Sequence, residues 1–244
     1  MNTAGYITDI QFHNDLFKDS YLNDLSVIKH LSEAKFMSFT SNITFFVGEN
    51  GTGKSTLLEA IAVAYGFNAE GGTKNFHFST NKTHSELCNH LTLVKKRYAK
   101  DGFFLRAESL YNAATYIDEI DASHNYGHTS LHNQSHGESF LSIIQNRFSG
   151  KGLYILDEPE AALSPMRLLT LIKEIDYLVN NDSQFIIATH SPILMAFPGA
   201  QIWEFSKDGI RTTNYKDTEH YIVTKRFLED PERMLHYLLN TEDL

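Results

Sequence analysis

The chain has 244 residues, 42% of them hydrophobic, and a formal net charge of −9 at pH 7. This length allows one or two domains with a sizeable core. The acidic balance excludes a surface that is basic all over, so a nucleic acid could be bound only through a local basic patch. The single cysteine, Cys88, excludes an internal disulfide and a zinc site made of cysteines.

The sequence also lacks targeting signals. No apolar run approaches the roughly 18 residues that a membrane-spanning helix needs. Residues 1–10 do not show the basic stretch followed by an apolar stretch that marks a secretory signal. Together with the cysteine content, these features predict a cytoplasmic protein with no membrane insertion of its own.

Short apolar segments predict strands in the first half of the chain, over residues 6–12, 36–39, 43–47, 91–94 and 102–105. The second and third of these strands are expected to pair with each other. The basic run 95–100 is expected to be the solvated tip of a hairpin between the last two, with contact to nucleic-acid phosphates as the alternative. Helical spacing predicts helices over residues 54–66 and 107–120. Residues 16–35 have a mixed pattern that indicates no single element.

The second half of the chain alternates helices and strands more regularly. Helices are predicted over residues 139–147, 165–179, 217–228 and 231–240, and strands over residues 152–156, 185–188, 202–205 and 210–215. The last two strands are expected to form a hairpin around residues 207–209. Strands that alternate with helices predict an α/β fold with a largely parallel central sheet flanked by helices.

A glycine-rich loop carries the most specific motif. Residues 48–56 match G-x-x-x-x-G-K-[ST], the phosphate-binding P-loop, between a predicted strand and a predicted helix. Glycines let the loop amides point at a phosphate chain, and the helix N-terminus adds partial positive charge. Lys54 can reach the β- and γ-phosphates, and Ser55 can coordinate Mg²⁺. The residues expected to bind a nucleoside triphosphate are Asn50, Gly51, Thr52, Gly53, Lys54, Ser55 and Thr56.

Two carboxylates, Asp157 and Glu158, follow the predicted strand 152–156. Parallel sheets build their sites at the carboxyl ends of strands. Asp157 is therefore a candidate ligand of Mg²⁺, directly or through water, and Glu158 a candidate to polarise a water aimed at the γ-phosphate. An acidic pair in an ordinary turn is the alternative, and the P-loop upstream disfavours it.

Two further segments add polar groups. His190 follows the predicted strand 185–188, one helix and one strand after the acidic pair, so we expect it at the same edge of the sheet. A purely structural histidine is the alternative. Residues 135–139, Ser-His-Gly-Glu-Ser, precede a predicted helix and supply a second anion-binding N-terminus, although any N-capped helix has similar residues.

In combination, these motifs resemble those of the ABC-type ATPases within the P-loop NTPases. Segments 48–56, 135–139, 156–159, 162–164 and 189–191 have the order and spacing of the Walker A, signature, Walker B, D-loop and switch-histidine motifs. The resemblance implies an ABC-type fold with a β-rich and helical lobe that carries the signature motif. It further implies a single ATPase domain over residues 1–244, in which residues 68–134 form an inserted lobe or arm before the signature.

In that family two heads enclose two ATP molecules, each bound by the Walker A motif of one head and the signature of the other. The resemblance therefore implies a homodimer in the ATP-bound state, with ATP and Mg²⁺ as cofactors. The signature residues Ser135, Gly137 and Glu138 would contact the partner's γ-phosphate. The roles carried over within one chain are catalytic for Glu158 and His190 and metal-binding for Ser55 and Asp157.

Several positions depart from the family pattern. His136 replaces the second glycine of the signature, Gln134 its opening leucine, and Ser164 the usual aspartate of the D-loop. Glu138 matches the SMC and RecF-like chromosome and repair ATPases better than the transporters. No glutamine lies between Walker A and residue 134, so the Q-loop glutamine of transporters is missing, and Glu108 is the candidate substitute.

Residues 57–134 are too few to hold a coiled coil as well as core strands. The chain therefore most resembles the small stand-alone AAA, SMC or RecF-like ATPase heads of bacteria. The resemblance implies ATP hydrolysis in a DNA-linked process of repair or phage defence, with DNA or a nuclease as candidate partner. The alternatives are the ATP-binding subunit of a membrane transporter and an ATP-controlled switch with a protein partner.

Four histidines, His124, His128, His132 and His136, recur every four residues. On a helix they would align as metal ligands. The glycine, asparagines and serines around them favour a solvated loop instead.

Overall fold

The computed structural model describes residues 5–13, 21–24, 26–73, 86–106 and 135–240. The strands are β1 (Ile7–Phe12), β2 (Phe36–Ser38), β3 (Ile43–Gly48), β4 (Leu91–Lys95), β5 (Asp101–Arg106), β6 (Gly152–Asp157), β7 (Gln184–Ala188), β8 (Gln201–Ser206) and β9 (Gly209–Thr213). The helices are α1 (Ser26–Ala34), α2 (Lys54–Tyr65), α4 (His136–Arg147), α5 (Pro165–Asn180), α6 (Pro192–Met195), α7 (Glu219–Glu229) and α8 (Pro231–Leu239). Together they form the predicted α/β fold.

The main sheet has six strands in the order β5-β6-β7-β3-β8-β9. Neighbouring strands from β5 to β8 run parallel, and β9 closes the sheet as the antiparallel arm of the predicted hairpin with β8. Every residue of β3, β6 and β7 is buried, which explains why these strands read as continuous apolar runs rather than alternating ones.

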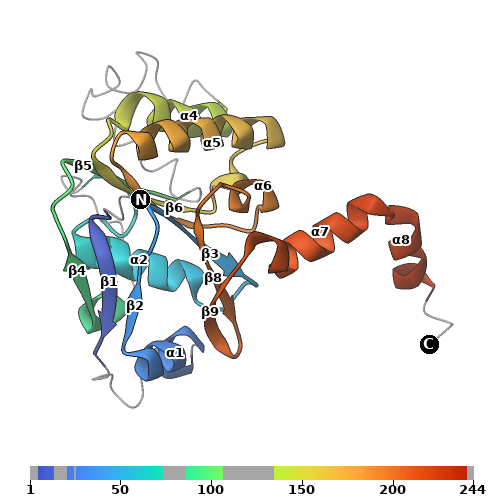
Figure 1. Cartoon of the computed structure of the whole chain (residues 1–244), viewed down its shortest axis with the longest axis horizontal. Helices are drawn as coiled ribbons and strands as arrows, with labels where there is room; N and C mark the ends of the chain where they lie inside the picture. The colour runs from blue at the N-terminus through green and yellow to red at the C-terminus, as the bar shows by residue number, and fades with distance from the viewer. Residues whose placement is uncertain (1–4, 14–20, 25, 74–85, 107–134, 241–244) are drawn as a thin grey trace.

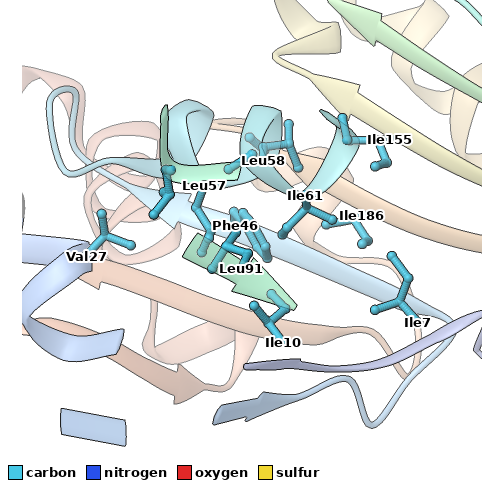
Figure 2. Close-up of a cluster of buried hydrophobic side chains, with 14 of the residues drawn as sticks. Ile7, Ile10, Val27, Phe46, Leu57, Leu58, Ile61, Leu91, Ile155 and Ile186 are labelled. Atoms are coloured by element: carbon cyan, nitrogen blue, oxygen red, sulfur yellow. The ribbon is translucent and has the colours of Figure 1, made fainter. Parts of the chain in front are cut away.

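Helices cover both faces of this sheet (Figure 1). Helix α2 packs on one face and is itself covered by a second, three-stranded antiparallel sheet in the order β2-β1-β4. Figure 2 shows Leu57, Leu58 and Ile61 of α2 among side chains of both sheets. Helices α4 and α5, with the signature region, pack on the opposite face. The signature helix and the P-loop helix are therefore separated by the main sheet.

The register aligns the ends of the three central strands. Asp157 at the end of β6 lies opposite Ala188 at the end of β7, and Ala188 lies opposite Phe46 near the end of β3. Parallel strands end at one edge, so the P-loop, the acidic pair and the segment after β7 meet there, as the sequence predicts.

Two predictions about the first half of the chain were wrong. Strand β2 pairs with β1 in the small sheet and not with β3 in the main one. Strands β4 and β5 do not form a hairpin, because β4 pairs with β1 and β5 with β6. Residues 16–35, which had no prediction, contain α1, whose Val27, Ile28 and Leu31 are buried. Local patterns identified the strands but not their partners.

The basic run between β4 and β5 connects the two sheets. The Arg97 guanidinium forms an ion pair with Asp182 and lies 4.5 Å from the centre of the Tyr6 ring. Lys95 Nζ lies 4.8 Å from the Tyr65 ring. Both side chains are thus engaged within the chain itself.

The C-terminal helices α7 and α8 project from the body as an arm (Figure 1). Neither has a buried residue.

In the part of the chain that the structure describes, no helix is long and apolar enough to cross a membrane. The predicted helix 107–120, Glu108 and the histidines at 124, 128 and 132 lie outside the described residues.

Candidate active site

The P-loop is shaped by glycines that no other residue could replace without strain. Gly48, Gly51 and Gly53 have φ angles of +136°, +80° and +94°. A Cβ atom on Gly48 would lie 2.2 Å from the Phe205 carbonyl oxygen, and one on Gly53 would lie 2.5 Å from Val27 Cγ1. At Gly48 and Gly53 the loop can therefore pack this closely only because these two positions lack side chains.

Helix α2 begins at Lys54 directly after the loop, and its N-cap is Gly53. Since glycine has no side chain to cap the first turn, the amides of that turn stay available to an anion. Asn50 and Gly51 are exposed at the tip of the loop, while Ser55 and Thr56 are half-buried in the first turn. This arrangement fits the phosphate cradle that the sequence predicts.

Lys54 lies inside the loop and is only 4% exposed. Its Nζ atom donates hydrogen bonds to the carbonyl oxygens of Gly48 and Glu49, at 2.7 and 2.8 Å. Burial lowers the pKa of Lys54, and the carboxylates of Glu158 and Asp157 oppose this shift. A buried ammonium bonded to carbonyl oxygens can exchange them for the more strongly attracting oxygens of a phosphate.

The candidate metal residues are in direct contact. Ser55 Oγ donates a hydrogen bond of 3.0 Å to Asp157 Oδ1, although 102 residues separate them in sequence. Asp157 is 6% exposed. A hydroxyl and a carboxylate are hard oxygen ligands of the kind that Mg²⁺ takes together with phosphate oxygens and water. In the described part of the chain, no group of three or more His, Cys, Asp or Glu side chains forms a metal cage.

Glu158 has an unusual backbone. Its φ of +49° and ψ of +53° lie in the left-handed region, and its amide donates a 3.0 Å hydrogen bond to the Ala188 carbonyl. Its side chain is 39% exposed. Such strain in a residue other than glycine is concentrated at functional sites, where the surrounding structure holds it in place. Here it turns Glu158 out of the strand that buries Asp157.

His190 lies beside Glu158 at the same edge. Its Nε2 atom is 3.6 Å from Glu158 Oε1 and is shielded from solvent. Burial is the main cause that lowers the pKa of His190, and the positive charge of Lys54 acts in the same direction. The structure therefore brings together Lys54, Ser55, Asp157, Glu158 and His190, the within-chain part of the predicted site.

The signature residues are held separately, at the start of α4. Ser135 is its N-cap and forms a capping box with Glu138. Arg167 of α5 donates to Glu138 Oε1 at 2.9 Å and to Ser135 Oγ at 3.2 Å. The amide and hydroxyl of Ser135, followed by Arg167, hold the pKa of Glu138 below its usual value. The helix begins at His136, three residues earlier than predicted, because Ser135 caps it.

Gly137 is buried where α4 meets the segment before α5. A Cβ atom there would lie 2.6 Å from Arg167 Nη1 and 2.8 Å from the Ala162 carbonyl oxygen. Ser135 and Glu138 are exposed. Among the described residues, their side chains bond to each other and to Arg167. The structure thus does not bring the signature to the P-loop of its own chain.

A family model described as an AAA domain matches residues 26–233, a span that includes every motif from the P-loop to His190. The chain belongs to the AAA domain family. This membership agrees with the P-loop ATPase that the motifs predict.

The chain is also similar to individual proteins and to solved structures. It is 26% identical over 106 residues to "Structural maintenance of chromosomes protein 6" of Takifugu rubripes, a match that covers 40% of the chain and 9% of that protein. Among solved structures, CbiO1 of Clostridium perfringens, part of the ABC transporter complex cbiONQ, is 18% identical with a TM-score of 0.49, over 95% of this chain and 99% of that one. The SMC head domain from Thermotoga maritima is 15% identical with a TM-score of 0.46, over 85% and 98%.

Sequence reasoning missed three residues of this AAA domain site. Arg106 at the end of β5 lies 3.4 Å from Asp157 Oδ2 and 2.7 Å from Glu59 Oε2. Glu160 accepts hydrogen bonds from the Thr189 hydroxyl at 2.8 Å and from the His190 amide. His220 of α7 lies 3.0 Å from His190 Nδ1.

Arg106 could have been suspected from its place at a strand end beside β6. No signal in the sequence indicated Glu160 or His220, because each depends on contacts between distant segments.

Proposed function

We propose that this AAA domain hydrolyses ATP to ADP and phosphate. The observation that carries the proposal is the hydrogen bond between Ser55 and Asp157, which places the P-loop helix against the acidic end of β6. Lys54 and the amides of the loop bind the phosphates and stabilise their negative charge. Asn50, Gly51, Thr52, Gly53 and Thr56 complete this phosphate-binding loop.

Ser55 and Asp157 would hold the Mg²⁺ ion, which neutralises phosphate charge when bound. Their contact supports this role, since both already present oxygen atoms to the same point. Arg106 lies on the other oxygen of Asp157, so it fixes the orientation of that carboxylate.

Glu158 positions the attacking water in this proposal, and two observations favour it over its neighbour Glu160. The Glu158 carboxylate is 39% exposed, whereas Glu160 is engaged by Thr189 and the His190 amide. Burial raises the pKa of Glu160, which favours its neutral form. In this proposal His190 binds the γ-phosphate end through Nε2, and since that atom is shielded from solvent, the side chains around it must move for the contact.

The decisive experiment substitutes Glu158→Gln, which removes the charge and keeps the shape. Loss of positioned acid–base help costs about 10²–10⁴-fold in rate. We expect turnover to fall by that range while ATP binding, measured by calorimetry with Mg²⁺, persists. Glu160→Gln is the matched control and should lower the rate less. Unchanged hydrolysis in Glu158→Gln would refute the assignment.

We also propose that two copies associate around ATP. Support comes from the exposed side chains of Ser135 and Glu138, which with the buried Gly137 would complete the site of the partner copy. The Glu158→Gln variant is expected to keep ATP bound without hydrolysing it, so its oligomeric state with ATP can be measured by light scattering. Detection of only the monomeric protein, with ATP bound, would contradict the homodimer.

For the process that the ATP cycle drives, we propose a DNA-linked role or the switching of a protein partner. The similarity to a protein named for the maintenance of chromosomes supports the first. The net charge of −9 and the pairing of Arg97 within the chain support the second. Stimulation of the ATPase by DNA or RNA that weakens with added salt would establish the first role. The absence of stimulation would favour the second.

A further inference from the structure

His190 does not face the site alone, because a second histidine holds its other nitrogen. His190 Nδ1 and His220 Nε2 lie 3.0 Å apart, with ring centres separated by 5.1 Å and planes inclined by 53°. His190 follows β7, and His220 lies in the first turn of α7. A contact of this length between two ring nitrogens requires one hydrogen between them, donated by one ring and accepted by the other.

Both rings are attached firmly to the body of the protein. The amide of His190 donates to Glu160, and the hydroxyl of Thr189 donates to the same carboxylate. On the other side, Thr218 is fully buried and caps α7 by accepting from the Tyr221 amide at 3.3 Å. The Glu219 amide donates to Glu204 Oε1 at 3.3 Å. The two rings therefore meet in a fixed geometry.

The charges around the pair decide which ring donates. Burial lowers the pKa of both histidines, with Lys54 acting in the same direction, while Glu158 opposes the shift at His190 and Glu219 and Glu204 oppose it at His220. Both rings are therefore neutral near pH 7, and each carries one N–H. If Nε2 of His190 carried no hydrogen, its lone pair would face the Glu158 carboxylate, 3.6 Å away, and repel it. The opposite tautomer, with the hydrogen on Nε2, avoids this repulsion.

We propose that His220 is a positioning residue that donates its Nε2–H to His190 Nδ1 and so holds His190 in the Nε2–H tautomer. In this state His190 presents a hydrogen-bond donor toward Glu158 and the γ-phosphate end. The inference rests on the proposed ATP hydrolysis, because that reaction gives the donor its use. It also makes the start of the C-terminal arm a part of the ATPase site.

The tautomer can be measured without any activity. Long-range ¹H–¹⁵N correlation spectra of the labelled protein distinguish Nε2–H from Nδ1–H in a neutral imidazole, and His190→Asn assigns the signals. We expect His190 as the Nε2–H tautomer in the wild-type protein and as a mixture in His220→Ala. The Nδ1–H tautomer of His190 in the wild-type protein would overturn the inference, whatever the ATPase does.

Kinetics give the second readout. Loss of the residue that orients a metal-binding histidine costs about 10–100-fold, and we expect the same range for a histidine oriented toward a phosphate. We expect His220→Ala to lower kcat in that range with little change in the KM for ATP. His220→Gln, whose amide nitrogen can donate in place of the ring, should recover most of the rate. His236→Ala, on the exposed part of the arm, is the matched control and should leave the rate unchanged.

The outcomes separate the two proposals. A wild-type protein without ATPase activity contradicts the proposed function, and the spectra still decide the tautomer. A wild-type protein that hydrolyses ATP, with His220→Ala equally active or with His220→Gln no better than His220→Ala, contradicts the role of His220. If His220→Ala does not fold, the same spectra, recorded on the wild type and on His220→Gln, decide the role of His220.

Discussion

The P-loop edge and the signature end of this chain are held in place by different means. At the P-loop edge, Lys54 and Asp157 are 4% and 6% exposed and are fixed by strands that are buried along their whole length. At the signature end, Ser135 and Glu138 are exposed and are fixed by a capping box and by Arg167. In the first region the core holds the candidate site residues in place, whereas in the second region the polar side chains lie on an ordered surface.

This difference bears on how the two regions act together. In the proposed dimer, the phosphate that meets the signature belongs to the partner copy, because the structure does not bring this segment to the P-loop of its own chain. The contrast can be tested by substitutions that affect one region and leave the other intact.

Among the substitutions that compare the two regions, Ser135→Asp is expected to have the largest effect. Aspartate accepts at a helix N-cap as serine does, but its carboxylate faces the partner's phosphate in the proposed dimer and, unlike the Ser135 hydroxyl, cannot donate to Glu138. We expect kcat to fall about 10²-fold, as when one stabilising donor is lost from a reaction site. ATP binding to the monomer, measured by calorimetry, should persist. Ser135→Asn caps equally well without the charge and is the matched control.

Mixing two variants, Ser135→Asp and Lys54→Ala, provides a stricter form of this experiment. In a dimer of Ser135→Asp with Lys54→Ala, one site joins an intact P-loop to an intact signature. Activity should therefore return when the two inactive proteins are combined. A mixture that stays inactive, although its chains associate, would show that the signature does not act across the dimer.

A loss of stability is expected next, from Gly48→Ala in the P-loop edge. The added Cβ would meet the Phe205 carbonyl at 2.2 Å, and the backbone φ is +136°. We expect a decrease of about 2–4 kcal/mol in the free energy of unfolding, measured with urea. Gly51→Ala is the control, because its φ is +80° but no atom lies within 4 Å of the added carbon, and it should cost about 1 kcal/mol. Equal losses would show that the close contact with β8 is not the cause.

A smaller effect is expected from pH. Burial lowers the folded-state pKa of His190 and His220 below the usual value, so the unfolded chain binds protons first as the pH falls. Their contribution to stability is therefore complete above about pH 6.5 and is lost as the pH falls through the lowered folded-state pKa. Urea unfolding of the wild type and of His220→Gln at about pH 8 and pH 5.5 measures this. The variant should lose less stability on acidification, and an identical loss would contradict the expectation.

The smallest effect is expected from Arg167→Ala at the signature end. Arg167 and Glu138 are 32% and 52% exposed, and ion pairs of this kind contribute about 0–1 kcal/mol. Arg106→Ala is the matched substitution at the P-loop edge, where the side chains of Glu59 and Asp157 are 14% and 8% exposed. We expect the larger decrease in unfolding free energy there. The reverse order would contradict the contrast between the two regions.

Most of the site within one chain could be predicted from the sequence. The P-loop, Asp157, Glu158 and His190 each follow a buried strand, and parallel strands bring such ends to one edge. Of the residues that support them, Arg106 also lies at a strand end, but Glu160 and His220 could not be predicted in this way. Arg106, Glu160 and His220 reach the site through contacts between segments that are distant in sequence.

The sequence by itself determined the α/β class, the strand–loop–helix of the P-loop and the carboxylates at the end of β6. These follow from local spacing, since a run of apolar residues or a helical repeat indicates its element wherever it lies. Only the tertiary structure decided that β2 and β4 leave the main sheet to cover α2, that α1 forms, and that α7 brings His220 to His190. Strand pairing and contacts between helices join distant residues, and no local pattern records which distant surface will bury a given face.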